Sequence, residues 1–243
     1  MAKTTGMNMG RDEKKLRQAI IDKCRWMNAS GLNQGTSGNI SARYKDAMLI
    51  TPSATPYDAM TPEMIAAMPL NAKGPGKDAS FEGPLKPSSE WRFHFDILRA
   101  RPEVNAIVHT HSTYATVLAI HRMGIPACHY MIASFGGVDL KCSGYARFGT
   151  QELSDLALVA LEGRNACLLA NHGMIATGPG LERAMWIAGE LETIAKQYYL
   201  ALALGAPVIL SDEQVEEARL AFKGYGLQEA KAAPAKRRTA RAK

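Results

Sequence analysis

The stretch VNAIVHTHSTYA, residues 104–115, joins a short apolar run to two histidines and then to the beginning of a helix. The apolar run is typical of a buried strand. Because side chains two apart on a strand share a face, His109 and His111 should project together at its end. One metal ion can satisfy two buried imidazoles at once, since both neutral rings become ligands. The alternative at this point is a hydrogen-bonded pair of surface histidines, because the His-x-His motif is short.

Strands and helices alternate on both sides of this stretch. Apolar periodicity and capping residues predict helices at residues 12–31, 61–68, 88–102, 113–124, 150–164, 180–205 and 211–226. Thr150 is a predicted cap, and Ser211 with Gln214 forms a capping box. Further strands are predicted around residues 39–44, at 47–53 and at 166–178, the last one broken by an Asn-His-Gly turn. We therefore predict a single α/β domain with a central β-sheet between helix layers.

Bulk composition favours an ordinary globular protein of the cytoplasm. Hydrophobic residues make up 47% of the 243 residues, and charged residues make up 21%. No segment is apolar enough to span a bilayer, and the N-terminus lacks the apolar run of a signal peptide. The four cysteines are scattered, which favours reduced, packed thiols over disulfides.

The basic character of the chain lies at its C-terminal end. Residues 231–243 carry six basic side chains and no acidic one, which equals the net charge of +6 for the whole chain. We predict a neutral domain over residues 1–230 and a disordered basic tail over 231–243, because the tail has too few apolar residues to pack. Such a tail could contact RNA or an anionic surface. Its composition favours a solvated end instead, so neither nucleic acid nor a membrane is an expected partner.

A third histidine and a carboxylate would complete a catalytic metal site. His172 follows an apolar strand at a His-Gly turn, where Gly173 leaves room beside the ring. Three histidines leave one coordination position open, as in catalytic zinc sites. Glu90, at a predicted helix start, is the best candidate for proton transfer. The other histidines, His94, His121 and His129, are expected to be packed or surface residues.

Three turns rich in hydroxyl groups are candidates for binding phosphate. They contain, in chain order, Thr36, Ser37, Gly38 and Asn39, then Ser53, then Ser88 and Ser89. The free N–H groups and positive dipole end of a helix start favour an anion beside the last pair. Each turn alone is weak evidence, because such turns and capping serines are common. Three of them beside a three-histidine site favour a phosphorylated substrate.

Nine motifs, in this order, carry a resemblance to one known family. They are LNQGTSGNIS, ITPSATPYDAM, KPSSEW, AIVHTHSTYATVLA, HYMIA, GYARFGTQEL, LLANHGMIATG, LSDEQ and FKGYGL. Together they resemble the class II aldolase/adducin family, nearest its L-fuculose-1-phosphate aldolase branch. The resemblance runs from Leu16 to Leu227.

The resemblance implies a homotetramer with active sites between neighbouring subunits. It assigns Zn²⁺, one per subunit, to His109, His111 and His172, and catalysis to Glu90 and to Tyr130 of a neighbouring subunit. Tyr225 would close the site. The implied phosphate-binding residues are Thr36, Ser37, Gly38, Asn39, Ser53, Ala54, Ser88 and Ser89. Ala54 departs from the branch, which has glycine there, and its methyl group could reshape the phosphate site.

The implied activity is a zinc-dependent aldolase reaction. A deoxy-ketose 1-phosphate, either L-fuculose 1-phosphate or a 5-deoxyribulose or 5-methylthioribulose 1-phosphate, would give dihydroxyacetone phosphate and a small aldehyde. The same fold also supports decarboxylases, dehydratases and 4-epimerases. The epimerase branch has aspartate after its two serines, whereas Glu90 stands there in this chain. A non-enzymatic adducin-like binding module is disfavoured, because such modules lack the metal ligands that are present here.

Overall fold

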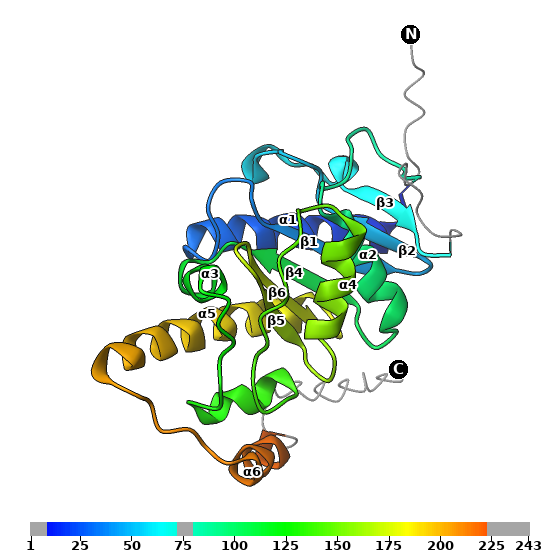
Figure 1. Ribbon diagram of the computed structural model, residues 1–243. Helices are drawn as coiled ribbons and strands as arrows, with labels where there is room; N and C mark the ends of the chain where they lie inside the picture. Colours follow the sequence, from blue (N-terminus) through cyan, green and yellow to red (C-terminus); the bar gives the residue numbers. More distant parts are fainter. Residues whose placement is uncertain (1–8, 72–79, 223–243) are drawn as a thin grey trace, which may run out of the picture.

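Six strands form one antiparallel sheet at the centre of the molecule, in the order β3-β2-β1-β4-β6-β5 (Figure 1). The computed structural model describes residues 9–71 and 80–222. The strands are β1 Asn39–Tyr44, β2 Ala47–Ile50, β3 Ala66–Pro69, β4 Ala106–Thr110, β5 Ala166–Leu169 and β6 Gly173–Gly178. β4 lies in the middle of this order, so the histidine-bearing stretch occupies the centre of the sheet, as expected from its apolar run.

Helices cover both faces of the sheet, which confirms the predicted α/β architecture. α1 (Arg11–Ala29), α3 (Thr113–Ile120) and α5 (Leu181–Leu204) share one hydrophobic cluster with Ala106 and Val108 of β4. α2 (Trp91–Ala100) and α4 (Gln151–Ala160) share a second cluster with Ile107. The side chains of β4 therefore alternate between two cores, as the two-residue period of a strand requires.

α6 (Asp212–Phe222) stands apart from the sheet, after an extended segment that follows α5 (Figure 1). It packs beside the 3-10 helix η3, Tyr130–Phe135. The backbone N–H of Leu210 donates to Ala127 O at 2.9 Å and fastens the extended segment to this region. The capping box of α6 is confirmed, because Ser211 N donates to Gln214 Oε1 at 2.9 Å and Gln214 N donates to Ser211 Oγ at 3.3 Å. Thr150 is likewise a confirmed cap, of α4.

The predicted helix at residues 61–68 is wrong. Two 3-10 turns, η1 Tyr57–Ala59 and η2 Pro62–Met64, precede a strand at Ala66–Pro69. This strand pairs with β2, and its side chains alternate between buried and partly buried. Alanine and methionine have high helix propensity, but tertiary context overrides this weak preference, and the hydrogen bonds offered by the edge of β2 decide the local structure.

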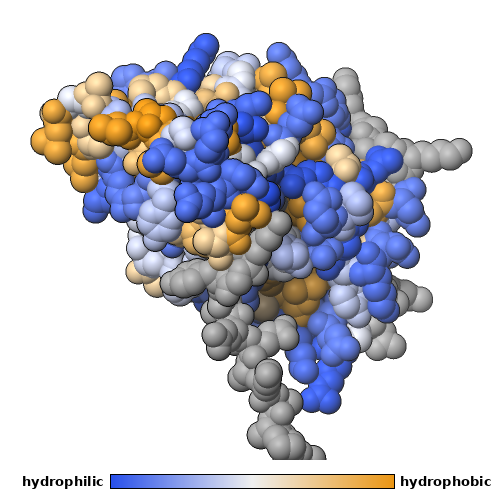
Figure 2. All heavy atoms as spheres, turned by 90° about the horizontal axis from the view of Figure 1, so that it is seen from below, coloured by the Kyte–Doolittle hydropathy of each residue, from blue (hydrophilic) through white to orange (hydrophobic). Residues whose placement is uncertain are grey.

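Exposed apolar side chains gather at the end of α5 and in the segment after it. They are Tyr199, Leu200, Leu202, Leu204, Val208 and Ile209. Figure 2 shows orange side chains concentrated at this end of the molecule. Contiguous exposed apolar surface of this kind often marks a protein–protein contact. None of the described helices is long and apolar enough to cross a membrane.

Candidate metal and phosphate site

Three histidine rings meet at one end of the sheet. The ring centroids of His109, His111 and His172 lie 4.8–4.9 Å from one another. His109 is the last but one residue of β4, His111 follows that strand, and His172 lies in the turn between β5 and β6. Because β4 pairs directly with β6, the start of β6 and the end of β4 are adjacent. The predicted convergence of these three residues is what the structure contains.

Local packing orients the rings for ligation. Nδ1 of His109 lies 2.9 Å from the carbonyl oxygen of Met174, which can only accept, so Nδ1 carries the proton and Nε2 presents a lone pair. Gly173 is required beside the neighbouring ring, because an added Cβ would lie 2.5 Å from Thr110 O and 2.9 Å from His111 Cδ2. Burial, with a contribution from the other two histidines, lowers the pKa of His111 to about 4, which favours its neutral, ligating form.

Glu90 is buried against this cluster. Its Oε2 lies 3.2 Å from His109 Nε2, and its Oε1 lies 2.9 Å from His172 Nε2. Apart from this contact with His172, Oε1 has no hydrogen-bond partner within the described residues. Burial raises the pKa of the Glu90 carboxyl, but His109 and His172 outweigh this effect and hold it well below its usual range. Glu90 is therefore a carboxylate, not a neutral acid, when the site is empty of substrate.

The four groups fit one divalent ion. Their ligand atoms all lie within 4.8 Å of one another. His109 Nε2 and His111 Nε2 are 3.1 Å apart. Two metal–nitrogen bonds of about 2.0–2.1 Å at a tetrahedral angle would put ligand atoms about 3.3 Å apart. Without an ion, two ring nitrogens and a carboxylate oxygen would crowd one another in a dry site, so the donor set itself favours a bound metal.

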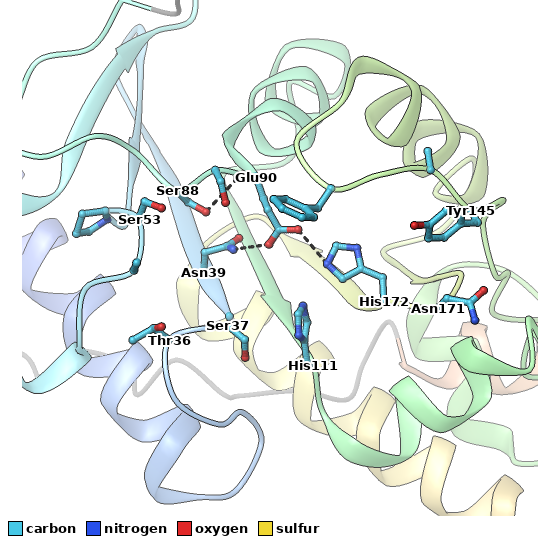
Figure 3. Close-up of a pocket in the computed structure, with 16 residues that line it drawn as sticks. Thr36, Ser37, Asn39, Ser53, Ser88, Glu90, His111, Tyr145, Asn171 and His172 are labelled. Atoms are coloured by element: carbon cyan, nitrogen blue, oxygen red, sulfur yellow. Dashed lines mark hydrogen bonds and ion pairs between the residues drawn. The ribbon is translucent and has the colours of Figure 1, made fainter.

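The three hydroxyl-rich turns come together beside the histidines. Ser88 N donates to Thr51 O at 2.9 Å and Ser53 N donates to Lys86 O at 3.0 Å, which aligns the second turn with the third. The first turn enters β1, whose neighbour is β4. An added Cβ on Gly38 would lie 2.8 Å from His109 O, so only glycine lets the first turn approach β4 this closely. Figure 3 shows Thr36, Ser37 and Ser53 on one side of Glu90 and His172.

The helix predicted over residues 88–102 begins later than expected, and Ser88 and Ser89 lie before its N-cap. α2 begins at Trp91, and Glu90 occupies the N-cap position without a side-chain cap bond. Ser88 Oγ accepts from Glu90 N at 3.3 Å. Ser89 is exposed. The helix start therefore aims its positive end at Glu90 and at the turn where phosphate was expected.

A cavity of about 380 Å³ connects these parts. Its lining includes all eight residues predicted to bind phosphate, together with Glu90, His111 and His172. It also includes Tyr145, Phe148 and Asn171, which the sequence analysis did not single out. Tyr145 and Asn171 lie on the opposite side of Glu90 from the hydroxyl groups (Figure 3). The signal for these residues was their position in GYARFGTQEL and LLANHGMIATG, two of the motifs that carried the resemblance.

The predicted catalytic residue Tyr130 lies away from this cavity in its own chain. Tyr130 is 53% exposed and does not line it. Its ring packs instead on Phe222 of α6, with ring centroids 6.1 Å apart. Tyr225 and residues 231–243 lie outside the described residues. His94, expected to be packed or at the surface, is fully buried and hydrogen-bonded to Asn39 and Ser41, so it borders the site from behind.

Known proteins resemble this chain over most of its length. Residues 18–199 match the family model described as the Class II Aldolase and Adducin N-terminal domain. The L-fuculose phosphate aldolase of Escherichia coli (strain K12) is 46% identical over 218 residues, which are 89% of this chain and 98% of that protein. A 5-methylthioribulose-1-phosphate/5-deoxyribulose-1-phosphate aldolase of Rhodospirillum rubrum is 48% identical over 211 residues, which are 87% of this chain and 92% of that protein. A solved L-fuculose 1-phosphate aldolase superposes with a TM-score of 0.81 at 40% identity, covering 88% of this chain and 98% of that one.

Proposed function

The chain belongs to the class II aldolase and adducin family, and from this we propose that it is a zinc-dependent aldolase that acts on a deoxy-ketose 1-phosphate. The products are dihydroxyacetone phosphate and a small aldehyde, and the reaction is reversible. One observation carries the proposal. Three imidazoles and a buried carboxylate converge at the same cavity as three hydroxyl-rich turns. An adducin-like binding module has no use for such a donor set.

Different parts of the cavity suit different parts of the substrate. The phosphate binds the hydroxyl and N–H groups of the three turns, in front of the N-terminus of α2. This holds the unreactive end, so that its binding energy orients the reacting carbons. His109, His111 and His172 hold the ion, and imidazole ligands favour zinc. When bound, the ion supplies a Lewis acid that polarises the ketone and stabilises the negative charge that develops as the carbon–carbon bond breaks.

Glu90 transfers the proton to and from C3 of the substrate. In the cleavage direction the C4 hydroxyl loses a proton, the C3–C4 bond breaks, the aldehyde leaves, and C3 gains a proton. Glu90 lies within 3.2 Å of His109 Nε2 and lines the cavity, which supports a role for its carboxyl group in protonating C3. In the condensation direction the same carboxylate removes that proton from dihydroxyacetone phosphate.

A tyrosine from a neighbouring subunit transfers the proton of the C4 hydroxyl group. Tyr130 is exposed and lies outside its own chain's cavity, as expected of a residue that enters a partner's site. The exposed apolar surface at the end of α5 supports association of the chain with copies of itself. We propose a homotetramer in which the Tyr130 oxygen takes up the C4 hydroxyl proton as the phenol passes its own proton to water, so that the tyrosine relays the proton and is unchanged overall.

The aldehyde end of the substrate faces the aromatic side of the cavity. Tyr145 and Phe148 are 57% and 56% exposed, and both line the cavity. Tyr145 lies opposite the hydroxyl groups (Figure 3). The two rings offer an apolar surface that suits a deoxy or methylthio terminus rather than a second charged group. The two named relatives differ in substrate yet have almost equal identity to this chain, 46% and 48%. The choice among fuculose, deoxyribulose and methylthioribulose 1-phosphates therefore rests on a substrate panel.

The experiment measures kcat/KM for these three sugar phosphates and for their unphosphorylated forms, with zinc-loaded enzyme. We expect cleavage of at least one phosphorylated ketose and release of dihydroxyacetone phosphate. Glu90→Gln should keep the metal and lose about 10²–10⁴ in kcat, the usual worth of a positioned acid–base group. Glu103→Gln, a change at an exposed ion pair with Arg101, is the matched control and should be silent.

A second measurement separates an aldolase from enzymes of the same fold. In deuterated water, the wild-type enzyme should exchange one C3 proton of dihydroxyacetone phosphate when no aldehyde is present. A decarboxylase or a dehydratase has no step that would cause this exchange. A zinc-loaded enzyme that neither exchanges this proton nor cleaves any member of the panel would refute the proposed function.

A further inference from the structure

A buried chain of hydrogen bonds runs behind Glu90, away from the cavity. Asn39 Nδ2 donates to Glu90 Oε2 at 2.9 Å. On its other side, Asn39 Oδ1 contacts His94 Nε2, and His94 Nδ1 lies 2.8 Å from Ser41 Oγ. Ser41 and His94 are fully buried, and Asn39 and Glu90 are 4% and 6% exposed. The chain thus crosses from the interior of the protein to the carboxylate without contact with bulk water.

The chemistry of each group fixes the direction of every hydrogen bond. An ionised carboxylate only accepts, so the amide nitrogen of Asn39, and not its oxygen, must face Glu90. The amide oxygen then faces His94 and can only accept, so His94 carries its proton on Nε2. Nδ1 of the neutral ring is left as an acceptor and takes the proton of the Ser41 hydroxyl. With the opposite tautomer of His94, the amide would turn and place its oxygen against the carboxylate.

His94 is held in its neutral form by its surroundings. Burial lowers the pKa of His94 to about 3, with His109 acting in the same direction and Glu90 opposing it. The Phe93 ring stacks on it, with centroids 4.7 Å apart and planes inclined by 24°. Ser41 and Asn39 lie on β1, while His94 and Glu90 belong to α2 and its N-cap, so the bonds also join sheet to helix.

We propose that His94 is a positioning residue that, through Asn39, holds Oε2 of Glu90 in a fixed hydrogen bond and leaves Oε1 as the oxygen that carries the proton. Oε1 receives no hydrogen bond from Asn39; its neighbour is Nε2 of His172, 2.9 Å away, which is one of the three proposed metal ligands. The inference rests on the proposed function, because the choice between the two carboxylate oxygens affects the rate only if Glu90 transfers a proton. It also gives Asn39 a task that differs from binding phosphate: its side chain orients the acid–base group.

The test begins with the wild-type protein. Long-range ¹H–¹⁵N NMR spectra of ¹⁵N-histidine-labelled protein should show His94 as the neutral Nε2–H tautomer. The Nδ1–H tautomer, or a charged ring at neutral pH, would overturn the proposal. This measurement needs no activity, so its result stands whether or not the aldolase assignment does.

Two variants then test the consequence for catalysis. His94→Gln places an amide N–H near the position of Nε2 and preserves the donor to Asn39. His94→Asn is similar in polarity but too short to reach it. We expect His94→Asn to lose about 10–100-fold in kcat, the usual effect of removing a supporting hydrogen bond. Metal content and KM should stay close to the wild-type values, because His94 does not line the cavity and is hydrogen-bonded to Asn39 and Ser41 rather than to the three histidines. His94→Gln should recover most of the lost rate, and His121→Gln, at an exposed histidine, is the control.

The experiments distinguish failure of the positioning role of His94 from failure of the proposed function. Equal kcat values for the Gln and Asn variants, or a deficit that appears in metal content or KM instead of kcat, would overturn the positioning role while wild-type cleavage persists. A wild-type enzyme without aldolase activity would refute the proposed function and leave the tautomer to be decided by NMR.

Discussion

Replacing Ala54 by glycine should stabilise the protein. Ala54 has φ +49°, in the left-handed region, and it lies exposed at the edge of the cavity. This conformation costs an L-residue about 1–2 kcal/mol, and glycine avoids that cost. Glycine also adds about 0.4–1 kcal/mol of conformational entropy to the unfolded chain, which acts in the opposite direction. The net gain should be about 0.5–1 kcal/mol, or about 1–4 °C in Tm for a chain of this size.

The assay is calorimetric unfolding at fixed protein and zinc concentrations, because bound metal also shifts Tm. Ala59→Gly is the matched control. Ala59 is exposed in η1 and is not among the described residues with positive φ, so glycine should destabilise it. The Ala54→Gly change also removes a methyl group from the phosphate side of the cavity, and KM for the sugar phosphate should fall. An unchanged or lower Tm for Ala54→Gly would refute the claim that this turn stores backbone strain.

Three further predictions concern the metal, the phosphate and pH. His111→Ala should lower bound zinc from about one equivalent per chain and abolish cleavage, and chelation of the wild type should do the same; a chelated protein with full activity and no residual metal would contradict the metal site. Ser89→Ala should raise KM for the phosphorylated ketose by an amount equal to about 1–3 kcal/mol, as expected when a donor to a charged group is lost, and equal activity on the unphosphorylated sugar would contradict the phosphate site. Because the pKa of His94 is about 3 in the folded protein and about 6.5 unfolded, the unfolded chain binds more protons between these values. The stability that His94 contributes is therefore complete above about pH 6.5 and is lost as the pH falls toward about 3. The free energy of unfolding of His94→Gln should depend less on pH in this window, as measured by urea denaturation.

Much of the site could be predicted because its signals are local. His109 and His111 are two apart on a strand, and the turn at His172 follows an apolar run, so period and turn chemistry were sufficient to select them. The link between Asn39 and His94 could not be read in this way. It depends on the register that sets Asn39 opposite His109 and on the packing of α2 against β1, and both are long-range. A histidine flanked by phenylalanines looks like any packed residue until its partner on another element is known.

The same contrast between local signals and long-range contacts explains the errors in the predicted fold. α1, α4 and α5 are long enough for an apolar stripe to accumulate, and their positions follow from the sequence. β3 has only four residues, mostly alanine and methionine, and it becomes a strand because β2 offers it a ladder of hydrogen bonds. Tyr145 and Phe148 lie in a segment without regular secondary structure, where no periodicity shows which way a side chain points.

The three candidate ligands and Glu90 come from distant parts of the chain: the end of β4, the turn before β6 and the start of α2. No fragment of the sequence holds the full set, so a nascent chain cannot complete the site until His172 has been synthesised and β6 has joined the sheet. An ion that binds only this finished arrangement would add about 2.7 kcal/mol to the stability of the native state at a free concentration of one hundred times its Kd. Opening of the sheet would then release the ion, so metal retention depends on correct folding as well as being required for catalysis.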